Sequence, residues 1–284
     1  MKTKSLAIIE ILLAYVILRF LGAGLRTTGI VQWEQETLGW SYIAEILFIA
    51  IPALVIWLAR RKWVDYGVSL VDWQTNLDVG IKAYLVRIIS VGALVATLML
   101  GIGYASLRGG LIIAIADVFA IVLMLWILSR QQTVQNGTKN LLITTLILLF
   151  PILVGLAMNR LTLIVVSTVV WQFFSGFGEE FVFRGYVQSR LNQVFGRPMR
   201  MFGIQFGAGL IVTSLLFGFF HAFNTYDPTI GLASLSWGWA LFTTFGGLFF
   251  GILREKTGSL LAPGIAHGLP DAVGEALGKI FGWM

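Results

Sequence analysis

The fold of this chain is decided by a stretch in its second half, residues 161–185, which reads LTLIVVSTVVWQFFSGFGEEFVFRG. Apolar and aromatic residues fill its first part. Two adjacent carboxylates and a guanidinium follow, at Glu179, Glu180 and Arg184. A charged side chain placed in hydrocarbon costs roughly 2.5–3.5 kcal/mol on insertion scales. We therefore expect this charged cluster to face a polar cavity among other helices.

The rest of the chain has the same apolar character. Of its 284 residues, 57% are hydrophobic and 12% are charged, whereas soluble domains carry about 25% charged residues. Repeated apolar runs near twenty residues predict an all-α polytopic membrane protein, a bundle of eight or nine transmembrane helices. The predicted spans are 5–25, 41–59, 82–106, 111–129, 140–158, 161–180, 203–223, 232–253 and 259–281. We also predict an interfacial loop at 63–80 and a helical extension of the sixth span into the headgroups at 181–200.

The net charge of +6 does not indicate nucleic-acid binding, because the cations lie mostly in short loops, where they orient spans and meet anionic headgroups. One side of the predicted membrane carries most of them: Lys2, Lys4, Arg60, Arg61, Lys62, Arg130, Lys139, Arg190, Arg197, Arg200, Arg254 and Lys256. By the positive-inside rule this side, with the N-terminus, is cytoplasmic. We expect a multi-pass protein of a prokaryotic cell membrane, with lipid as a partner. The absence of cysteine excludes disulfides and thiolate chemistry.

The only two histidines, His221 and His267, each lie in a further apolar segment. On a helix, Glu180 and Arg184 are one turn apart and can pair, whereas Glu179 points about 100° away. A buried carboxylate in that position suits a general base. A simpler interpretation is a salt-bridged helix end at the interface, with two histidines that hydrogen-bond neighbouring helices.

Other charges in apolar segments, Glu10, Glu45, Arg87 and Asp117, are explained by interfacial placement or helix pairing. The chain has no His-Glu-x-x-His motif of a zinc metalloprotease helix. It also lacks the Gly-x-Ser-Gly and Gly-x-Gly-Asp motifs of serine and aspartyl intramembrane proteases.

Three motifs in order resemble the CPBP family, which comprises type II CAAX prenyl endopeptidases and related bacteriocin-processing and self-immunity proteins. The family shows Glu-Glu-x-x-x-Arg, then Phe-x-x-x-His, then His-x-x-x-Asn or Asp. Here these motifs span Glu179 to Arg184, Phe217 to His221 and His267 to Asp271. The likeness covers roughly residues 165–275. It predicts a catalytic core at 161–284, preceded by transmembrane helices without a recognised motif at 1–160.

The resemblance implies an intramembrane endopeptidase that acts on a lipidated or membrane-associated peptide, which is prenylated in the CAAX proteases, at the cytoplasmic side. Glu179 would activate water with help from His221, and His267 and Asp271 would face the oxyanion. Glu180 and Arg184 would hold the helix and the base in place. Two other functions remain open: a non-catalytic scaffold or bacteriocin self-immunity protein with this fold, and a proton-coupled transporter that uses Glu179 and Asp117.

Two residues depart from the family pattern. Asp271 stands where the prenyl proteases usually have Asn, and an ionised carboxylate would repel an oxyanion. Asp271 would therefore be protonated, orient His267 or ligate a metal. Pro270 is expected to disrupt the helix about one turn upstream, so the sequence does not decide whether His267 and Asp271 share a face.

A zinc ion is the one cofactor to consider. Glu179, His221, His267 and Asp271 could supply mixed nitrogen and oxygen ligands. Because glutamate-activated water needs no metal, we favour a site with no cofactor.

The catalytic interpretation requires Glu179 and His221 to lie at a similar depth in the membrane. In an ideal hairpin of spans 161–180 and 203–223, Glu179 and His221 would lie roughly 20 Å apart at about 1.5 Å per residue. The two meet only if the sixth span sits shallower or residues 201–209 lie outside the bilayer core. The catalytic interpretation requires this offset.

Overall fold

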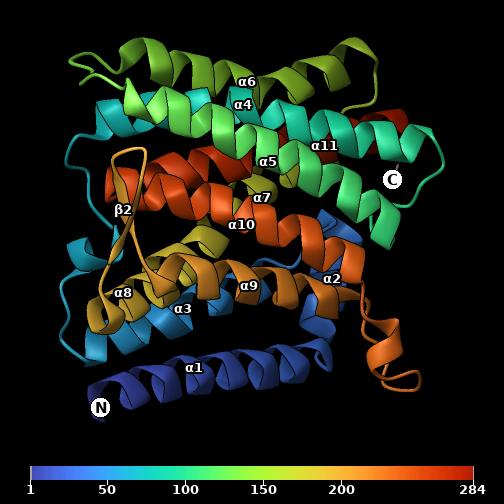
Figure 1. Ribbon diagram of the computed structural model, residues 1–284. Coiled ribbons are helices and arrows are strands. Elements are labelled where there is room, and N and C mark those ends of the chain that lie inside the picture. The colour runs from blue at the N-terminus through green and yellow to red at the C-terminus, as the bar shows by residue number, and fades with distance from the viewer. Residues whose placement is uncertain (1, 284) are drawn as a thin grey trace.

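The computed structural model describes residues 2–283 of the chain, as a bundle of helices that lie side by side (Figure 1). The α-helices are α1 (Lys2–Arg26), α2 (Gly29–Leu38), α3 (Tyr42–Leu58), α4 (Trp73–Met99), α5 (Leu107–Ser129), α6 (Thr138–Ala157), α7 (Leu163–Glu180), α8 (Ser189–Phe195), α9 (Ala208–Ala222), α10 (Trp237–Thr257) and α11 (Leu261–Phe281). The remaining elements are the 3₁₀ turns η1 (Trp63–Tyr66), η3 (Phe223–Thr225) and η4 (Leu232–Ser234), the π-helix η2 (Phe181–Gln188), and the hairpin of β1 (Met199–Met201) and β2 (Ile204–Phe206). Apart from this short hairpin, the predicted all-α class is confirmed.

Hydroxyl side chains begin several of the long helices. Ser41, Ser106, Thr162 and Ser236 each accept a hydrogen bond from the backbone N–H three residues further on. Such caps satisfy N–H groups that have no partner inside the helix. Helix starts are thus set locally by the sequence.

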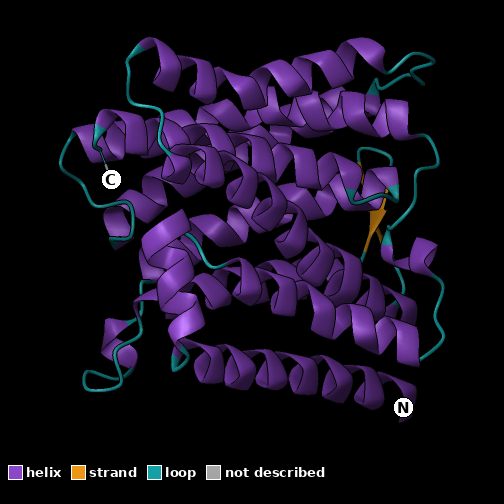
Figure 2. Cartoon of the chain, turned by 180° about the vertical axis from the view of Figure 1, so that it is seen from behind, coloured by secondary structure: helices purple, strands orange, loops and turns teal. Residues whose placement is uncertain are grey.

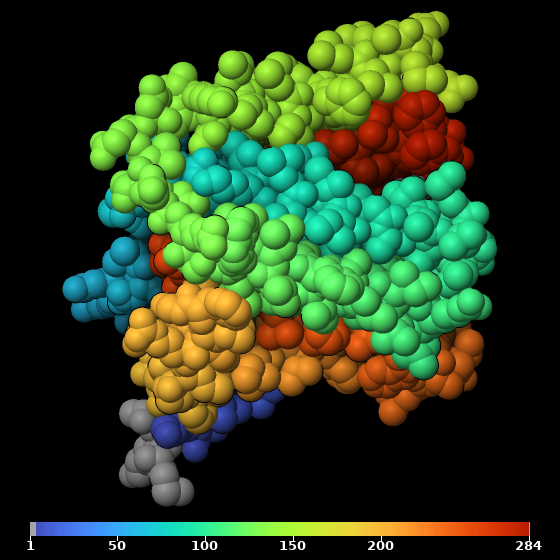
Figure 3. All heavy atoms as spheres, turned by 45° about the horizontal axis from the view of Figure 1, so that its top comes forward, coloured from blue at the N-terminus to red at the C-terminus, as the bar shows by residue number. Residues whose placement is uncertain are grey.

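The layers of the bundle place α11 and α10 inside. Helix α11 packs between α7 and α4, and α10 packs against α9 and α5. Helices α1 and α6 lie on the outside, as both ribbon views show (Figures 1 and 2). Only 17% of the apolar window of each is buried. In the space-filling view, α6 forms an outer layer above the end of α11 (Figure 3).

Among residues 2–283, five helices are long and apolar enough to cross a membrane, namely α1, α4, α5, α6 and α9 with its extension to Thr225. The pair α2–α3, bent by 119°, makes a sixth if it is one span. The chain is therefore an integral, multi-pass membrane protein. The predicted eight or nine spans are not reached by this criterion, because α7, α10 and α11 carry charged and small residues. Neighbouring helices cover much of the surface of α7, α10 and α11. These three helices therefore need fewer apolar residues on their surfaces.

One predicted boundary was wrong, because helix α4 begins at Trp73, inside the segment predicted as the loop 63–80. The predicted helical extension beyond residue 180 is present, through η2 and α8 to Phe195, but its predicted place among lipid headgroups was wrong. Every residue of η2 is buried, so protein, and not lipid headgroups, surrounds the segment after Glu180.

The N-terminus, the loop after α3 and the β-hairpin lie at one end of the bundle, and the C-terminus lies at the other (Figures 1 and 2). At the N-terminal end, Arg60, Arg61, Lys62, Arg197 and Arg254 line a common cavity. Loops far apart in the sequence thus gather their cations at one end.

Candidate active site

Three helices bring Glu179, His221 and His267 together. Glu179 lies at the end of α7, His221 in the last turn of α9, and His267 in the first half of α11. Beyond Glu179 the helix continues through η2 and α8 for roughly 24 Å, and α9 rises roughly 20 Å from Ala208 to His221, at about 1.5 Å per residue. Because α8 and the hairpin supply the offset, Glu179 and His221 lie at the same depth.

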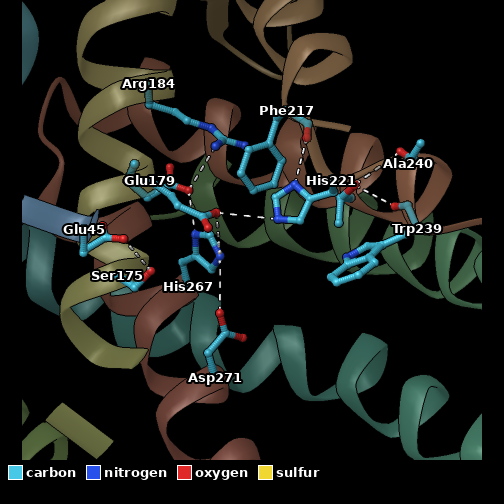
Figure 4. Close-up of polar contacts among 12 residues, drawn as sticks. Glu45, Ser175, Glu179, Arg184, Phe217, His221, Trp239, Ala240, His267 and Asp271 are labelled. Atoms are coloured by element: carbon cyan, nitrogen blue, oxygen red, sulfur yellow. Dashed lines mark hydrogen bonds and ion pairs between the residues drawn. The ribbon is translucent and has the colours of Figure 1, made fainter. Parts of the chain in front are cut away.

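The Glu179 carboxylate stands between the two imidazoles (Figure 4). Its Oε2 atom is 3.8 Å from Nε2 of His221 and 3.8 Å from Nε2 of His267. These separations are too long for direct hydrogen bonds. The Oε2 atom is buried, and no described residue donates a hydrogen bond to it. Since buried carboxylate oxygens are normally hydrogen-bonded, Oε2 of Glu179 lacks a donor that one small polar group could supply.

The backbone sets the tautomer of His221. Its Nδ1 atom is 2.8 Å from the carbonyl oxygen of Phe217, one turn back on α9. A carbonyl can only accept, so Nδ1 carries the hydrogen. In the neutral ring, Nε2 therefore presents its lone pair toward Glu179. The Phe217 ring packs edge-on against the imidazole, with centroids 4.5 Å apart.

Carboxylates surround His267. Its Nδ1 atom donates to Oε1 of Glu180 at 2.9 Å, and its Nε2 atom is 3.4 Å from Oδ2 of Asp271. Phe250 stacks on the ring at 4.5 Å with an interplanar angle of 14°. The orientation of His267 is thus defined on both edges and one face. Helix α11 is unbroken through Pro270, so His267 and Asp271 do share a face.

The predicted pair of Glu180 and Arg184 forms inside the protein. Nη1 of Arg184 is 3.1 Å from Oε1 of Glu180, and both side chains are 0% exposed. The Arg184 guanidinium also lies over the ring of Phe217 at 4.2 Å and that of Phe250 at 5.5 Å. Aromatic faces stabilise a desolvated cation. The two adjacent glutamates therefore have different partners. Glu180 forms an ion pair with Arg184, and Glu179 faces the imidazoles.

Close approach of α7 and α11 makes these contacts possible. A Cβ atom on Gly176 would lie 2.6 Å from backbone atoms of Gly268. Any side chain at position 176 would push α11 away, and His267 with it. These two glycines therefore control the distance between His267 and the two glutamates.

Sequence reasoning missed one carboxylate near the site. Glu45 of α3 accepts a hydrogen bond from Ser175 Oγ of α7 at 3.3 Å, and its Oε1 atom is buried without a partner among residues 2–283. Glu45 is within electrostatic range of Glu179 and His267. The only signal in the sequence was an acidic residue inside an apolar segment.

A second cluster joins α4 and α5. Arg87 pairs with Asp117, and the Ser90 hydroxyl donates to the same carboxylate. The Arg87 guanidinium lies 5.5 Å from the ring of Phe250, which stacks on His267. Asp117, the residue suggested for a transporter, is thus neutralised by an ion pair.

The four candidate zinc ligands, Glu179, His221, His267 and Asp271, do not fit a metal site as they stand. Within the described chain, no group of three or more His, Asp or Glu side chains is arranged to hold a metal ion. Each imidazole uses Nδ1 for a hydrogen bond, His267 to Glu180 and His221 to a carbonyl, so only the two Nε2 atoms are left as possible ligands. We therefore derive no chemical step through a metal.

Comparison with known proteins agrees with this geometry. Residues 161–273 match the family model described as type II CAAX prenyl endopeptidase Rce1-like. No curated protein and no solved structure matches the chain. The matched segment includes α7, η2, α9, α10 and the part of α11 that carries His267 and Asp271. Over this segment the chain is similar to the family of Rce1-like type II CAAX prenyl endopeptidases, and the match supports its place in the CPBP family.

Proposed function

We propose that this protein is an intramembrane endopeptidase in which Glu179 activates the water that attacks a peptide bond. The observation that carries the proposal is the Oε2 atom of Glu179, buried without a protein donor and 3.8 Å from Nε2 of both His221 and His267. Membership of a protease family supports protease activity in general. The role of Glu179 rests on geometry.

In the proposed reaction, a water lies between Glu179 and His221. Glu179 takes one proton as the water oxygen bonds to the scissile carbonyl carbon, and neutral His221 accepts the second hydrogen bond at Nε2. The tetrahedral intermediate then loses its carbon–nitrogen bond, and the proton held by Glu179 passes to the leaving amine. General-base catalysis of this kind typically contributes a factor of about 10²–10⁴.

His267 serves the opposite side of the reacting carbonyl. With its Nδ1–H held by Glu180, a doubly protonated ring would donate from Nε2 to the oxyanion. Such a donor typically contributes roughly 3–4 kcal/mol to the transition state. Asp271, 3.4 Å from the same nitrogen, would orient the ring instead of binding the oxyanion, which its charge would repel. This mechanism requires no metal ion.

We propose a lipidated peptide as the substrate. A cavity of about 360 Å³ opens between α1, α3, η2 and α9, with an almost wholly apolar lining. Among its lining residues are Phe48, Val182, Phe183, Phe219 and Phe220. The Phe183 ring packs 4.9 Å from that of Phe217, next to His221. A hydrocarbon chain in this cavity would hold its peptide near Glu179.

Topology completes the proposal. Residues 161–284 would form the catalytic core, and residues 1–160 would enclose it. The cation-rich end, with the N-terminus, would face the cytoplasm of a prokaryotic cell by the positive-inside rule. The substrate would be met at that side.

A cleavage assay in proteoliposomes tests the proposal. Wild type should cleave a farnesylated fluorogenic peptide, and Glu179→Gln or His221→Ala should lower the rate at least about a hundredfold. Glu36→Gln, at an exposed glutamate outside the site, is the matched control and should behave as wild type. No cleavage by folded wild type would favour a scaffold or immunity protein. Proton flux that survives His267→Ala would favour a transporter.

A further inference from the structure

A second cavity, of about 640 Å³ and with a polar lining, lies at the N-terminal end of the bundle. It is formed by the loop after α3, the turn η1, helix α8 and the end of α10. Its lining is rich in cations and contains one acidic residue: Arg60, Arg61, Lys62, Asp65, Arg197 and Arg254, with Val64, Ser189, Gln193 and Gly258. Peptide hydrolysis, as proposed above, makes no use of this cavity.

Arg254 is the buried cation of this cavity. It is only 5% exposed. Its Nη2 atom donates to the backbone carbonyl of Asp65 at 3.3 Å and to Ser189 Oγ at 3.0 Å. Its Nε atom has no acceptor, and no carboxylate lies within ion-pair distance of Arg254 in the described part of the chain. Glu255 acts on Arg254 only at longer range. A buried charge that no counter-charge contacts is costly, so Arg254 calls for an anion.

The surrounding backbone holds Arg254 in place. A Cβ atom on Gly67 would lie 2.8 Å from Nε of Arg254, and Gly67 has a φ of +81°. Only glycine combines this conformation with such a close approach. The guanidinium is thus fixed before any ligand arrives.

The charge balance of the cavity is positive. Arg61 is paired with Glu10 through contacts of 2.5 and 2.7 Å, and Arg197 with Glu255 at 2.5 Å. The lining cations Arg60 and Lys62 are exposed, and no ion pair involves either of them among residues 2–283.

We propose that this cavity binds a phosphate group, supplied by the headgroup of an anionic phospholipid. Arginine donates to phosphate oxygens through a fixed fork of N–H groups. Basic pockets between helices at the cytoplasmic interface suit lipid headgroups. The buried Arg254 would contact the phosphate from inside the protein. The exposed Arg60 and Lys62 would contact it from the water side. The inference is independent of the proposed peptide hydrolysis.

Purified full-length protein in an uncharged detergent provides the test. Dioctanoyl phosphatidylglycerol, dioctanoyl phosphatidylcholine and inorganic phosphate are titrated separately, with the thermal unfolding midpoint as the readout. Phosphatidylglycerol should raise the midpoint of wild type, and phosphatidylcholine should not. Lys62→Ala should weaken the apparent affinity about fivefold, and Arg254→Gln at least about tenfold. Lys139→Ala, an exposed cation outside the cavity, should bind as wild type.

The outcomes separate the sources of the phosphate. A shift with inorganic phosphate equal to that with the lipid would support the phosphate site and assign it to a free anion. Equal responses to the two lipids without a phosphate effect, or equal binding by Lys62→Ala and Lys139→Ala, would overturn the proposal. If Arg254→Gln fails to fold, Arg60→Ala and Lys62→Ala decide, because both side chains are exposed and unpaired by other described residues.

Discussion

Substituting Glu180 by glutamine removes the counter-charge of a fully buried guanidinium. Oε1 of Glu180 is 3.1 Å from Arg184 and 2.9 Å from His267, and both Glu180 and Arg184 are 0% exposed. Breaking a buried ion pair by removing one partner costs about 3–5 kcal/mol. Because the Phe217 ring still lies 4.2 Å from the guanidinium, we expect the lower end of that range, about 3 kcal/mol. Glu179→Gln breaks no such pair and should leave stability unchanged.

Reversible unfolding of the purified protein in mixed detergent micelles measures this difference. A loss of about 3 kcal/mol raises the unfolding constant by about a hundredfold. Both variants should lose peptide cleavage, Glu179→Gln because the base is gone and Glu180→Gln because His267 loses the negative charge that stabilises its doubly protonated form. Only Glu180→Gln should also lose stability.

A double-mutant cycle sharpens the test. Combining Glu180→Gln with Arg184→Met removes both charges, and with them the cost of leaving one buried charge unpaired. The double variant should therefore recover most of the lost stability without recovering activity. A Glu180→Gln protein as stable as wild type, or a Glu179→Gln protein that is the less stable of the two, would refute the division of roles.

Three further changes have defined outcomes. Gly176→Val should destabilise the protein by about 1–3 kcal/mol and slow cleavage, because the new side chain meets Gly268. Reversible unfolding measures the loss of stability, and the peptide assay measures the loss of rate. Asp271→Asn should keep the cleavage rate within about tenfold, whereas Asp271→Leu should lower it about a hundredfold by freeing His267; equal rates in the two variants would argue against an orienting role. Treatment with EDTA or 1,10-phenanthroline should leave the initial rate of cleavage within about twofold of the untreated enzyme, and loss restored by added zinc would contradict the metal-free mechanism.

Residue types and spacing predicted much of the site before any coordinates. The helical repeat placed Glu180 and Arg184 one turn apart, and the ion pair forms. Ordered motifs in apolar segments selected His221 and His267, and the structure brings both rings to Glu179. The positions of these side chains could be predicted because they depend on helix geometry and on the cost of charge in hydrocarbon, whereas their catalytic roles stay a prediction.

What the sequence did not predict depends on tertiary packing. The sequence predicted a helical extension after residue 180 but placed it among headgroups, whereas α9 and α3 bury residues 181–188. Helix α11 runs on through Pro270, although the proline lacks an N–H, because close packing against α7 and α4 holds it. Helices covered by protein carry charged and small residues, so a hydropathy criterion does not select them.

Two other omissions have the same origin. Glu45 reaches the site from α3, and Ser175 of α7 is the residue that meets it. Phe250 of α10 stacks on His267, but in the sequence it is one phenylalanine among many. Neither contact is encoded by local spacing, so only the packed bundle reveals them.

The central claim, that Glu179 activates water and does not itself attack the substrate, is tested most directly by a single turnover in oxygen-18 water. Mass spectrometry of the peptide product and of the proteolysed enzyme locates the label. The proposed mechanism predicts one labelled oxygen in the new carboxylate of the peptide and none in Glu179. Label in the Glu179 side chain would indicate a covalent acyl intermediate and would contradict the proposed mechanism.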